Sequence, residues 1–586
     1  MKSIIKLILF LTFVITIVHS HSSISIANKI KIDTNLVEDV KGVITCDLCL
    51  VVVKTVQAML QTETGQQDVL KYSVDTCVLF KIEKPEVCEG LLPLFSNETF
   101  DIVGNKSYSP EYLCGFVGIC PFTPKNFSGV VEFPKPKPPH VDPVPPKKGG
   151  PSATILHLSD LHVDTMYVAG SNNDCGEPIC CRAHNGMGSG PTAAGYWGDY
   201  HCDVNMPTLI SMLEHIASEH TIDYIQWTGD NVPHDIWMQT RETQLNATHH
   251  LTNLIKQYFP GVPVFPSIGN HEAVPVNAMQ LPPNSNWLFS ALTQYWGEWL
   301  DDDALSTLDF GGYYTVMMPP PLQNTRMVSL NMNWCNDQNL YLLADSTNPA
   351  GMITWLVNTL QAAEDAGQKV YIIGHIPPGI SDCVDVISQQ LYQIVNRYED
   401  SIVASFYGHT HRDGFEVYRT NDTTNRPSGV VYITPSTTTF QNQNPSYRIY
   451  TVDIDSSYLV ESSTYHIDLD QANQAGNSSL PIWKLEYNAT DVYQMDNLFA
   501  QDWQDVITRF STNHTMLTDY YNRIYSSSPY PIANPCTSNT CIQHTLCELE
   551  STFYYQYKAC IVKSYNNNLI SLINHYEFIN HQKQVC

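Results

Sequence analysis

The chain has 586 residues, and its 31 basic side chains against 58 acidic ones give a formal net charge of −27 with histidine neutral. Nucleic acid is therefore not an expected partner, because binding to a phosphate backbone needs clustered lysine and arginine. The length allows several folding units, one of them with a large core.

The N-terminus is predicted to be a secretion signal over residues 1–20. Two lysines precede the apolar run 7–18, and small residues that suit cleavage after Ser20 follow it. The run is too short for a membrane span, and no transmembrane segment is expected further along. Sequons of the N-x-S/T type indicate a glycoprotein that is secreted or lysosomal. They begin at Asn97, Asn105, Asn126, Asn246, Asn421, Asn477, Asn488 and Asn513.

Residues 42–124 hold six cysteines in a helix-rich stretch. A secreted chain is expected to pair them in disulfides, although spacing alone leaves the pairing open. The spacing resembles that of saposin B-type domains, which are small helical folds that expose apolar surface to lipid. This resemblance implies the pairs Cys46–Cys120, Cys49–Cys114 and Cys77–Cys88. The alternative is a disulfide-linked bundle that only packs against its neighbour.

Residues 125–151 are predicted to be a linker. The segment 134–151 is dense in proline, so we expect an extended, fairly stiff chain without a core of its own. Its four lysines are expected to lie in solvent, with contact to anionic membrane lipid as the alternative.

Five short apolar runs within residues 152–460 end in side chains that can bind metal. They read ILHLSDLHVD (155–164), YIQWTGDNVPH (224–234), VFPSIGNHE (264–272), VYIIGHIPPG (370–379) and VASFYGHTH (403–411). A β-rich run followed by glycine or aspartate is typical of a strand that ends in a loop. Because sites in layered α/β folds gather at the carboxyl ends of strands, we expect these loops to converge on one pocket.

The candidate ligands in these loops are carboxylate, imidazole and carboxamide groups, without a thiolate. They are Asp160, His162, Asp230, Asn270, His375, His409 and His411. So many ligands exceed the needs of one tetrahedral ion but suit two ions that share a carboxylate. The ligand types favour two zinc ions, with manganese or iron as alternatives.

The order D-x-H, GD, GNH, GH and GHTH resembles the calcineurin-like metallophosphoesterase superfamily over residues 152–460. The resemblance implies an α/β fold in which helices flank a β-sandwich. It assigns the first metal to Asp160, His162, Asp230 and His411. It assigns the second metal to the bridging Asp230 together with Asn270, His375 and His409.

Two further histidines in the same loops are candidate catalytic residues. Imidazole is the natural proton donor near neutral or lower pH. The superfamily pattern favours His271 as the general acid and His234 as the group that stabilises the phosphoryl oxygens. The alternative for His234 is that it only supports a metal ligand.

The remaining cysteines are expected to form further disulfides, with a zinc site as the alternative for the first group. The first group comprises Cys175, Cys180, Cys181 and Cys202, followed by the pair Cys335 and Cys383. Two short-range bridges are expected among Cys536, Cys541, Cys547 and Cys560, which leaves Cys586 over.

Residues 461–586 are predicted to form a helical C-terminal domain that contains disulfides. Segments 496–510 and 541–562 read as amphipathic helices rich in tyrosine and phenylalanine. We expect these aromatic side chains to pack in a core, with contact to choline-type cations or lipid as the alternative.

The whole order of segments resembles the acid sphingomyelinases, which implies an α+β multidomain, monomeric phosphodiesterase. Its expected reaction is hydrolysis of sphingomyelin to ceramide and phosphocholine at a membrane surface. One alternative is a related phosphodiesterase that acts on nucleotides, a group that lacks the saposin-like segment. A purple acid phosphatase is disfavoured because Pro233 stands where that family has a tyrosine. A non-catalytic lipid-binding protein is the remote alternative.

Overall fold

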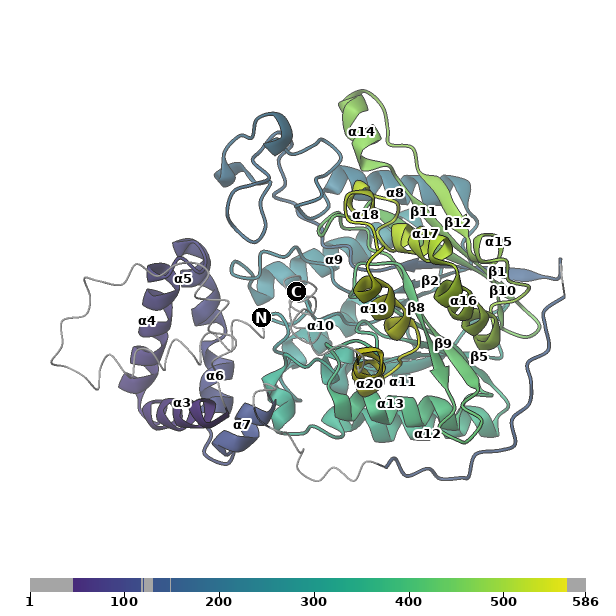
Figure 1. The fold of residues 1–586 in the computed structure, drawn as a ribbon, viewed down its shortest axis with the longest axis horizontal. Helices are drawn as coiled ribbons and strands as arrows, with labels where there is room; N and C mark the ends of the chain where they lie inside the picture. Colours follow the sequence, from purple (N-terminus) through teal and green to yellow (C-terminus); the bar gives the residue numbers. More distant parts are fainter. Residues whose placement is uncertain (1–45, 117–119, 121–129, 148, 566–586) are drawn as a thin grey trace. The chain divides into compact units, whose positions relative to one another are not determined.

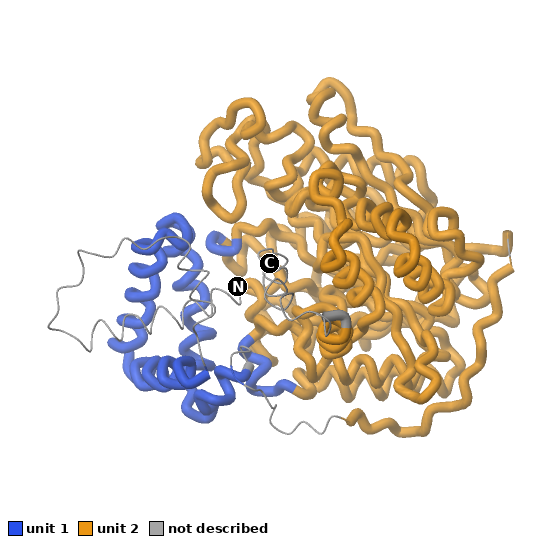
Figure 2. Tube along the Cα trace, viewed as in Figure 1, with its two compact units in different colours: residues 1–127, 236–238, 340–346 blue, residues 128–235, 239–339, 347–586 orange. Residues whose placement is uncertain are grey.

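A computed structural model describes residues 46–116, 120, 130–147 and 149–565. The predicted signal segment, the sequon at Asn126 and Cys586 lie outside these residues. The chain divides into two compact units (Figure 2). Unit 1 comprises residues 1–127, 236–238 and 340–346, and unit 2 comprises the rest. Among the described helices, none has both the length and the apolar character that crossing a membrane requires.

The helices of unit 1 are α3 (Cys46–Met59), α4 (Glu63–Leu79), α5 (Pro85–Leu94), α6 (Ser96–Val103) and α7 (Pro110–Phe116). Disulfides join Cys46 to Cys120, Cys49 to Cys114 and Cys77 to Cys88, which confirms the expected pairing. The side chains of Val53 and Val56 on α3 are buried in the core of the unit. Thr62 caps α4 by accepting the backbone N–H of Gly65.

The proline-dense segment 130–147 contains no helix or strand, as expected. Its lysines, however, are not simply solvated: Lys135 pairs with Asp365 at 2.6 Å and Lys137 with the buried Glu399 at 2.7 Å. The segment therefore runs along unit 2 through specific ion pairs. The partly exposed Lys135 pair contributes little stability by itself.

Unit 2 is built on two six-stranded sheets (Figure 1). The first has the order β12 (Lys484–Asn488), β11 (Leu459–His466), β10 (Ser446–Asp453), β1 (Ser152–Leu158), β2 (Tyr224–Trp227), β3 (Val264–Pro266). The second has the order β4 (Tyr314–Met317), β5 (Thr325–Ser329), β6 (Lys369–Ile373), β7 (Ile402–Tyr407), β9 (Pro427–Ile433), β8 (Gly414–Arg419). Strands β1, β2 and β3 run parallel, as do β5, β6, β7 and β9.

The two sheets share one hydrophobic core, to which Ile155 and Tyr450 come from the first sheet and Tyr371 and Phe406 from the second. Strands such as β2 are buried along their whole length, which explains why they read as unbroken apolar runs. The β-sandwich flanked by helices is thus confirmed.

Helices cover the outer faces of both sheets. α8 and α9 pack on the first sheet through Leu213 and Ile255, and α12 and α13 contact the second. The helices before the C-terminal part are α8 (Met206–Glu219), α9 (Arg241–Tyr258), α10 (Asn286–Trp296), α11 (Asp302–Gly311), α12 (Met352–Asp365) and α13 (Asp385–Arg397).

The C-terminal part contributes to the same core. Trp503 lies against Phe415 of β8 and donates a hydrogen bond from its indole N–H to Tyr432 of β9 at 3.0 Å. The aromatic side chains of these helices therefore pack in a core, as expected. The helices are α14 (Leu469–Ala475), α15 (Ala489–Tyr493), α16 (Ala500–Thr512), α17 (His514–Ile524), α18 (Pro529–Ala533), α19 (Asn539–Leu549) and α20 (Tyr554–Tyr565).

The disulfides of unit 2 join neighbouring cysteines of each predicted group, so the first group pairs rather than binding zinc through its thiols. They are Cys175–Cys180, Cys181–Cys202, Cys335–Cys383, Cys536–Cys541 and Cys547–Cys560. Strands β11 and β12 extend the first sheet beyond residue 460, so the C-terminal part shares that sheet as well as the core.

Candidate active site

The predicted ligands all lie just beyond the carboxyl ends of strands and are at most 4 % exposed. Asp160 and His162 follow β1, Asp230 follows β2, Asn270 follows β3, His375 follows β6, and His409 and His411 follow β7. Five of them, Asp160, His162, Asp230, His409 and His411, have positive φ angles between 39° and 68°. Side-chain-bearing residues adopt this left-handed backbone where the surroundings enforce it, as at functional sites.

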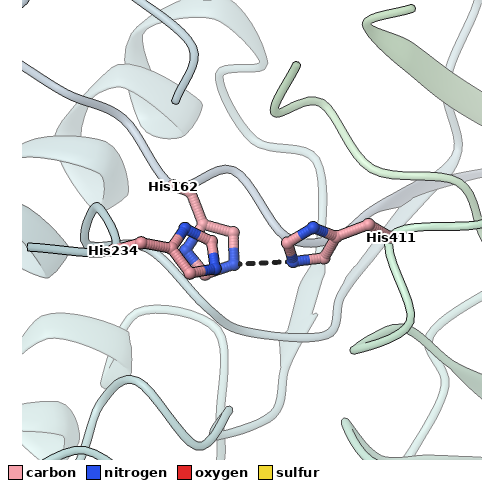
Figure 3. Close-up of side chains that lie close together, drawn as sticks. All are labelled: His162, His234 and His411. Atoms are coloured by element: carbon pink, nitrogen blue, oxygen red, sulfur yellow. Dashed lines mark hydrogen bonds between the residues drawn. The ribbon is translucent and has the colours of Figure 1, made fainter. Parts of the chain in front are cut away.

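One group of donor atoms gathers around His162. Its Nε2 lies 3.1 Å from Nε2 of His411 and 3.4 Å from Oδ2 of Asp230. Oδ1 of Asp160 lies 3.6 Å from Nε2 of His411. Figure 3 shows the rings of His162 and His411 turned toward each other, with the ring of His234 beside His162. The donor atoms of His162, His234 and His411, and those of His162, Asp230 and His271, lie close enough to hold a divalent metal.

A second group shares Asp230 with the first. Oδ2 of Asp230 lies 3.0 Å from Nε2 of His375, which lies 3.3 Å from Nδ1 of His409. The carboxamide oxygen of Asn270 lies 2.9 Å from the same Nδ1 atom. All seven side chains predicted as ligands therefore lie close together, and the carboxylate of Asp230 contacts a histidine of each group.

Backbone carbonyls fix the orientation of two of these rings. Nδ1 of His162 donates to the carbonyl of Val232 at 2.7 Å, and Nδ1 of His375 donates to the carbonyl of Thr228 at 2.6 Å. Both rings then present Nε2 toward Asp230, as is usual for metal-binding histidines.

The surroundings of Asp230 favour the ionised form of its carboxyl group. Burial raises the pKa of this carboxyl, but the neighbouring histidines outweigh burial, His375 most of all through its charge, and hold the pKa well below its usual value. The group thus carries its negative charge even in acid.

Sequence reasoning missed Glu272, which holds the two loops after β2 and β3 together. Its carboxylate accepts the backbone N–H groups of Gly269, Asp230 and Asn231 at 2.7, 3.0 and 2.9 Å. The chains approach so closely that a Cβ atom on Gly269 would stand 2.1 Å from Oδ1 of Asp230. The sequence signal that could have pointed to Glu272 is its position directly after Asn270 and His271 in the GNHE motif.

The two candidate catalytic histidines border the same site. Their ring centroids are 4.7 Å apart, and His234 lies 4.0 Å from the ring of His162. Nε2 of His234 and Nδ1 of His271 are buried and have no hydrogen-bond partner among the described residues. Burial lowers the pKa of His271 well below its usual value, although Asp230 opposes this shift. Both rings therefore offer a nitrogen for a further group.

Asp203 was also missed, because nothing in the sequence links it to His234, 31 residues further on. Its Oδ1 lies 2.8 Å from Nδ1 of His234, and its Oδ2 accepts the backbone N–H of the same residue at 2.7 Å. The pair resembles the imidazole–carboxylate arrangement that fixes a catalytic tautomer.

Comparison with known proteins agrees with this geometry. Residues 153–413 match the calcineurin-like phosphoesterase family, and residues 427–567 match the acid sphingomyelin phosphodiesterase C-terminal region. Sphingomyelin phosphodiesterase B of Dictyostelium discoideum is 52% identical over 536 residues, which cover 90% of this chain and 83% of the relative. Sphingomyelin phosphodiesterase of Homo sapiens is 38% identical over 521 residues, which cover 86% of this chain and 81% of the relative.

A third relative, cyclic GMP-AMP phosphodiesterase SMPDL3A of Homo sapiens, is 30% identical over 425 residues, which cover 70% of this chain and 90% of the relative. The match to Sphingomyelin phosphodiesterase B is longer and much higher in identity. The phosphoesterase fold implies a two-metal centre, and the buried carboxylate and imidazole groups fit one. The chain belongs to the sphingomyelin phosphodiesterase family, as a metal-dependent phosphoric diester hydrolase.

Proposed function

We propose that the protein hydrolyses sphingomyelin to ceramide and phosphocholine. The observation that carries the proposal is the pair of donor groups that share Asp230, in a chain that matches named sphingomyelin phosphodiesterases over most of its length. The donor set suits zinc, since it combines imidazole with carboxylate. The residues proposed to hold two ions are Asp160, His162, Asp230, Asn270, His375, His409 and His411.

The proposed mechanism assigns distinct roles to the protein's own side chains. Two divalent ions, when bound, lower the pKa of water and neutralise phosphoryl oxygens. His271 donates a proton to the departing ceramide oxygen, and His234 donates a hydrogen bond to a phosphoryl oxygen. Asp203 holds the ring of His234 so that Nε2 points into the site.

The deciding experiment compares substrates for the purified protein at about pH 5. We expect release of phosphocholine from sphingomyelin vesicles, together with slower turnover of ATP and of a soluble aryl phosphodiester. Turnover of the soluble substrates alone would contradict the lipid assignment and favour a nucleotide-cleaving enzyme.

Zinc is tested by removal and return. Dialysis against a chelator should abolish turnover, because the seven donor side chains cannot supply the positive charge that the ions bring to the phosphoryl oxygens. Addition of zinc should restore turnover. Manganese or iron that restores turnover where zinc does not would identify a different native ion. Metal content per chain, measured before and after, should follow the activity.

Unit 1 is proposed to act as a saposin-like domain that presents lipid. Its α3 exposes 59 % of Val51 and its α4 exposes 75 % of Leu79. Val51→Asp and Leu79→Asp should each lower turnover on vesicles by about tenfold or more, because each removes apolar contact with lipid. Turnover of a soluble diester should not change.

A matched control for these variants is Ile532→Asp, since Ile532 is 77 % exposed but belongs to unit 2. It should leave vesicle turnover near that of the unchanged protein. Equal losses for all three substitutions, or none for those in unit 1, would contradict lipid presentation by unit 1.

The protein is further proposed to be a secreted or lysosomal glycoprotein, monomeric and without a nucleic-acid partner. Eight disulfides among the described residues support an oxidising compartment, and most described sequon asparagines are exposed. Exposed positions are Asn97, Asn105, Asn246, Asn421, Asn477 and Asn513.

Two buried carboxyl groups are expected to stabilise the fold more in acid than at neutral pH. Burial raises the pKa of Glu98 and of Glu486 from 4.5 to about 8. Since the folded state holds protons that the unfolded chain releases, this stabilisation is present below about pH 4.5 and is lost toward about pH 8. Compared with a variant in which neither group can ionise, we expect the Tm of the metal-loaded protein to rise by on the order of 5 °C more between pH 8 and pH 5.

Glu98→Gln and Glu486→Gln keep a carbonyl oxygen for the N–H of Leu340 and the hydroxyl of Ser527, respectively, but cannot ionise. The double variant should show a flatter dependence of Tm on pH. An unaltered slope would show that other groups dominate the pH dependence.

A further inference from the structure

We propose that the Cys181–Cys202 disulfide positions His234 through the two residues that follow its cysteines in the sequence, Arg182 and Asp203. The inference rests on the proposed function, in which His234 contacts the phosphoryl group. The disulfide lies in the segment between β1 and α8, where the described chain has only short 3₁₀ turns and isolated bridges. Such a segment has no regular structure of its own to hold two side chains in register.

The first connection runs through Asp203, which is fully buried and directly follows Cys202. Its two carboxylate oxygens contact Nδ1 and the backbone N–H of His234 at 2.8 and 2.7 Å. The hydroxyl of Thr438 donates to Oδ1 of Asp203 at 3.0 Å and so fixes the carboxylate itself. Two contacts to one residue determine both where the imidazole lies and which nitrogen faces the site.

The second connection runs through Arg182, which is 1 % exposed and directly follows Cys181. Its Nε donates to Oδ2 of Asp164 at 2.8 Å, and its Nη1 donates to Oδ2 of Asp235 at 2.8 Å. Asp235 is the neighbour of His234. A planar guanidinium between two carboxylates is a rigid link, and its buried charges make loss of either partner costly.

The disulfide joins these two connections directly. Cys181 and Cys202 are fully buried, and their Cα atoms are 6.1 Å apart. Cys181 also has a φ of 66°, a left-handed conformation that a residue with a Cβ atom adopts only where its surroundings impose it. The disulfide thereby ties together Arg182, which contacts Asp235, and Asp203, which contacts the neighbouring His234.

The test compares two disulfides of the same segment. The variant Cys181→Ser/Cys202→Ser removes the proposed link. The control Cys175→Ser/Cys180→Ser removes the neighbouring bridge of the same segment, whose cysteines directly precede neither Arg182 nor Asp203. Amide hydrogen exchange at His234, followed in a peptide over residues 231–235, reports directly on the N–H that Asp203 accepts.

We expect exchange at His234 to become about tenfold faster or more in the first variant and to stay unchanged in the control. The kcat should fall about ten- to a hundredfold in the first variant with little change in KM, while both ions per chain are retained. Equal exchange and equal kcat in the two variants would overturn the proposal.

Single substitutions with the disulfide intact keep the proposal testable if the first variant does not fold. Asp203→Asn and Arg182→Gln should each accelerate exchange at His234 and lower kcat, and Arg182→Lys should restore part of the loss because it keeps the charge. Wild-type exchange and kcat in both Asp203→Asn and Arg182→Gln would refute the link. Exchange needs no turnover, so a protein inactive on every phosphodiester would contradict the proposed function while still deciding this inference.

Discussion

Replacement of Asp230 by asparagine is expected to lower turnover by on the order of 10³-fold or more and to reduce the metal content below two ions per chain. The carboxylate lies within 3.4 Å of a nitrogen of His162 and 3.0 Å of a nitrogen of His375, so both donor groups depend on it. A neutral carboxamide keeps the shape but removes the charge that two cations would share. Metal analysis of the purified variant, beside its turnover on vesicles, measures both effects.

Asp422→Asn is the matched control, because Asp422 is an exposed carboxylate in a turn of the same unit. It should retain both ions and full turnover. An Asp230→Asn protein with two ions and near-normal turnover would contradict the bridging role. Loss of both ions together with unfolding would instead show up as a collapse of Tm, which the control would not share.

Replacement of His271 by alanine is expected to leave both ions in place and to lower turnover by about 10²–10⁴-fold, the usual contribution of a general acid. Burial lowers the pKa of this ring well below its usual value, and the negative charge of Asp230 opposes that shift. The negative charge of a bound phosphodiester would raise the pKa of the ring in the same way. The comparison should use a natural lipid and a diester whose leaving group needs no proton.

The loss should be much smaller on the diester with the acidic leaving group, because that group departs as an anion. His201→Ala provides the control, since this histidine is exposed, pairs with Asp199 and lies outside the site. Equal losses on both substrates would assign His271 a role in binding or in holding Asp230, whose Oδ1 accepts its backbone N–H at 2.8 Å.

The sequence by itself was enough to predict the fold class and the seven side chains that the structure brings close together. The ligands could be predicted because parallel strands buried on both faces read as apolar runs, and each run ends at the residues that enter the site. The disulfide pairs of unit 1 followed from resemblance to a family, not from spacing.

Only the tertiary structure decided how the candidate ligands and the candidate catalytic histidines are supported. Asp203, Arg182 and Glu272 act through contacts between segments whose separation in the chain carries no period or motif. The ion pairs of Lys135 and Lys137 were missed for the same reason, because a proline-dense sequence specifies an extended chain but not the surface along which it runs. Side-chain types and strand ends are local properties that a sequence displays, whereas a hydrogen bond across 31 residues exists only after the core has packed.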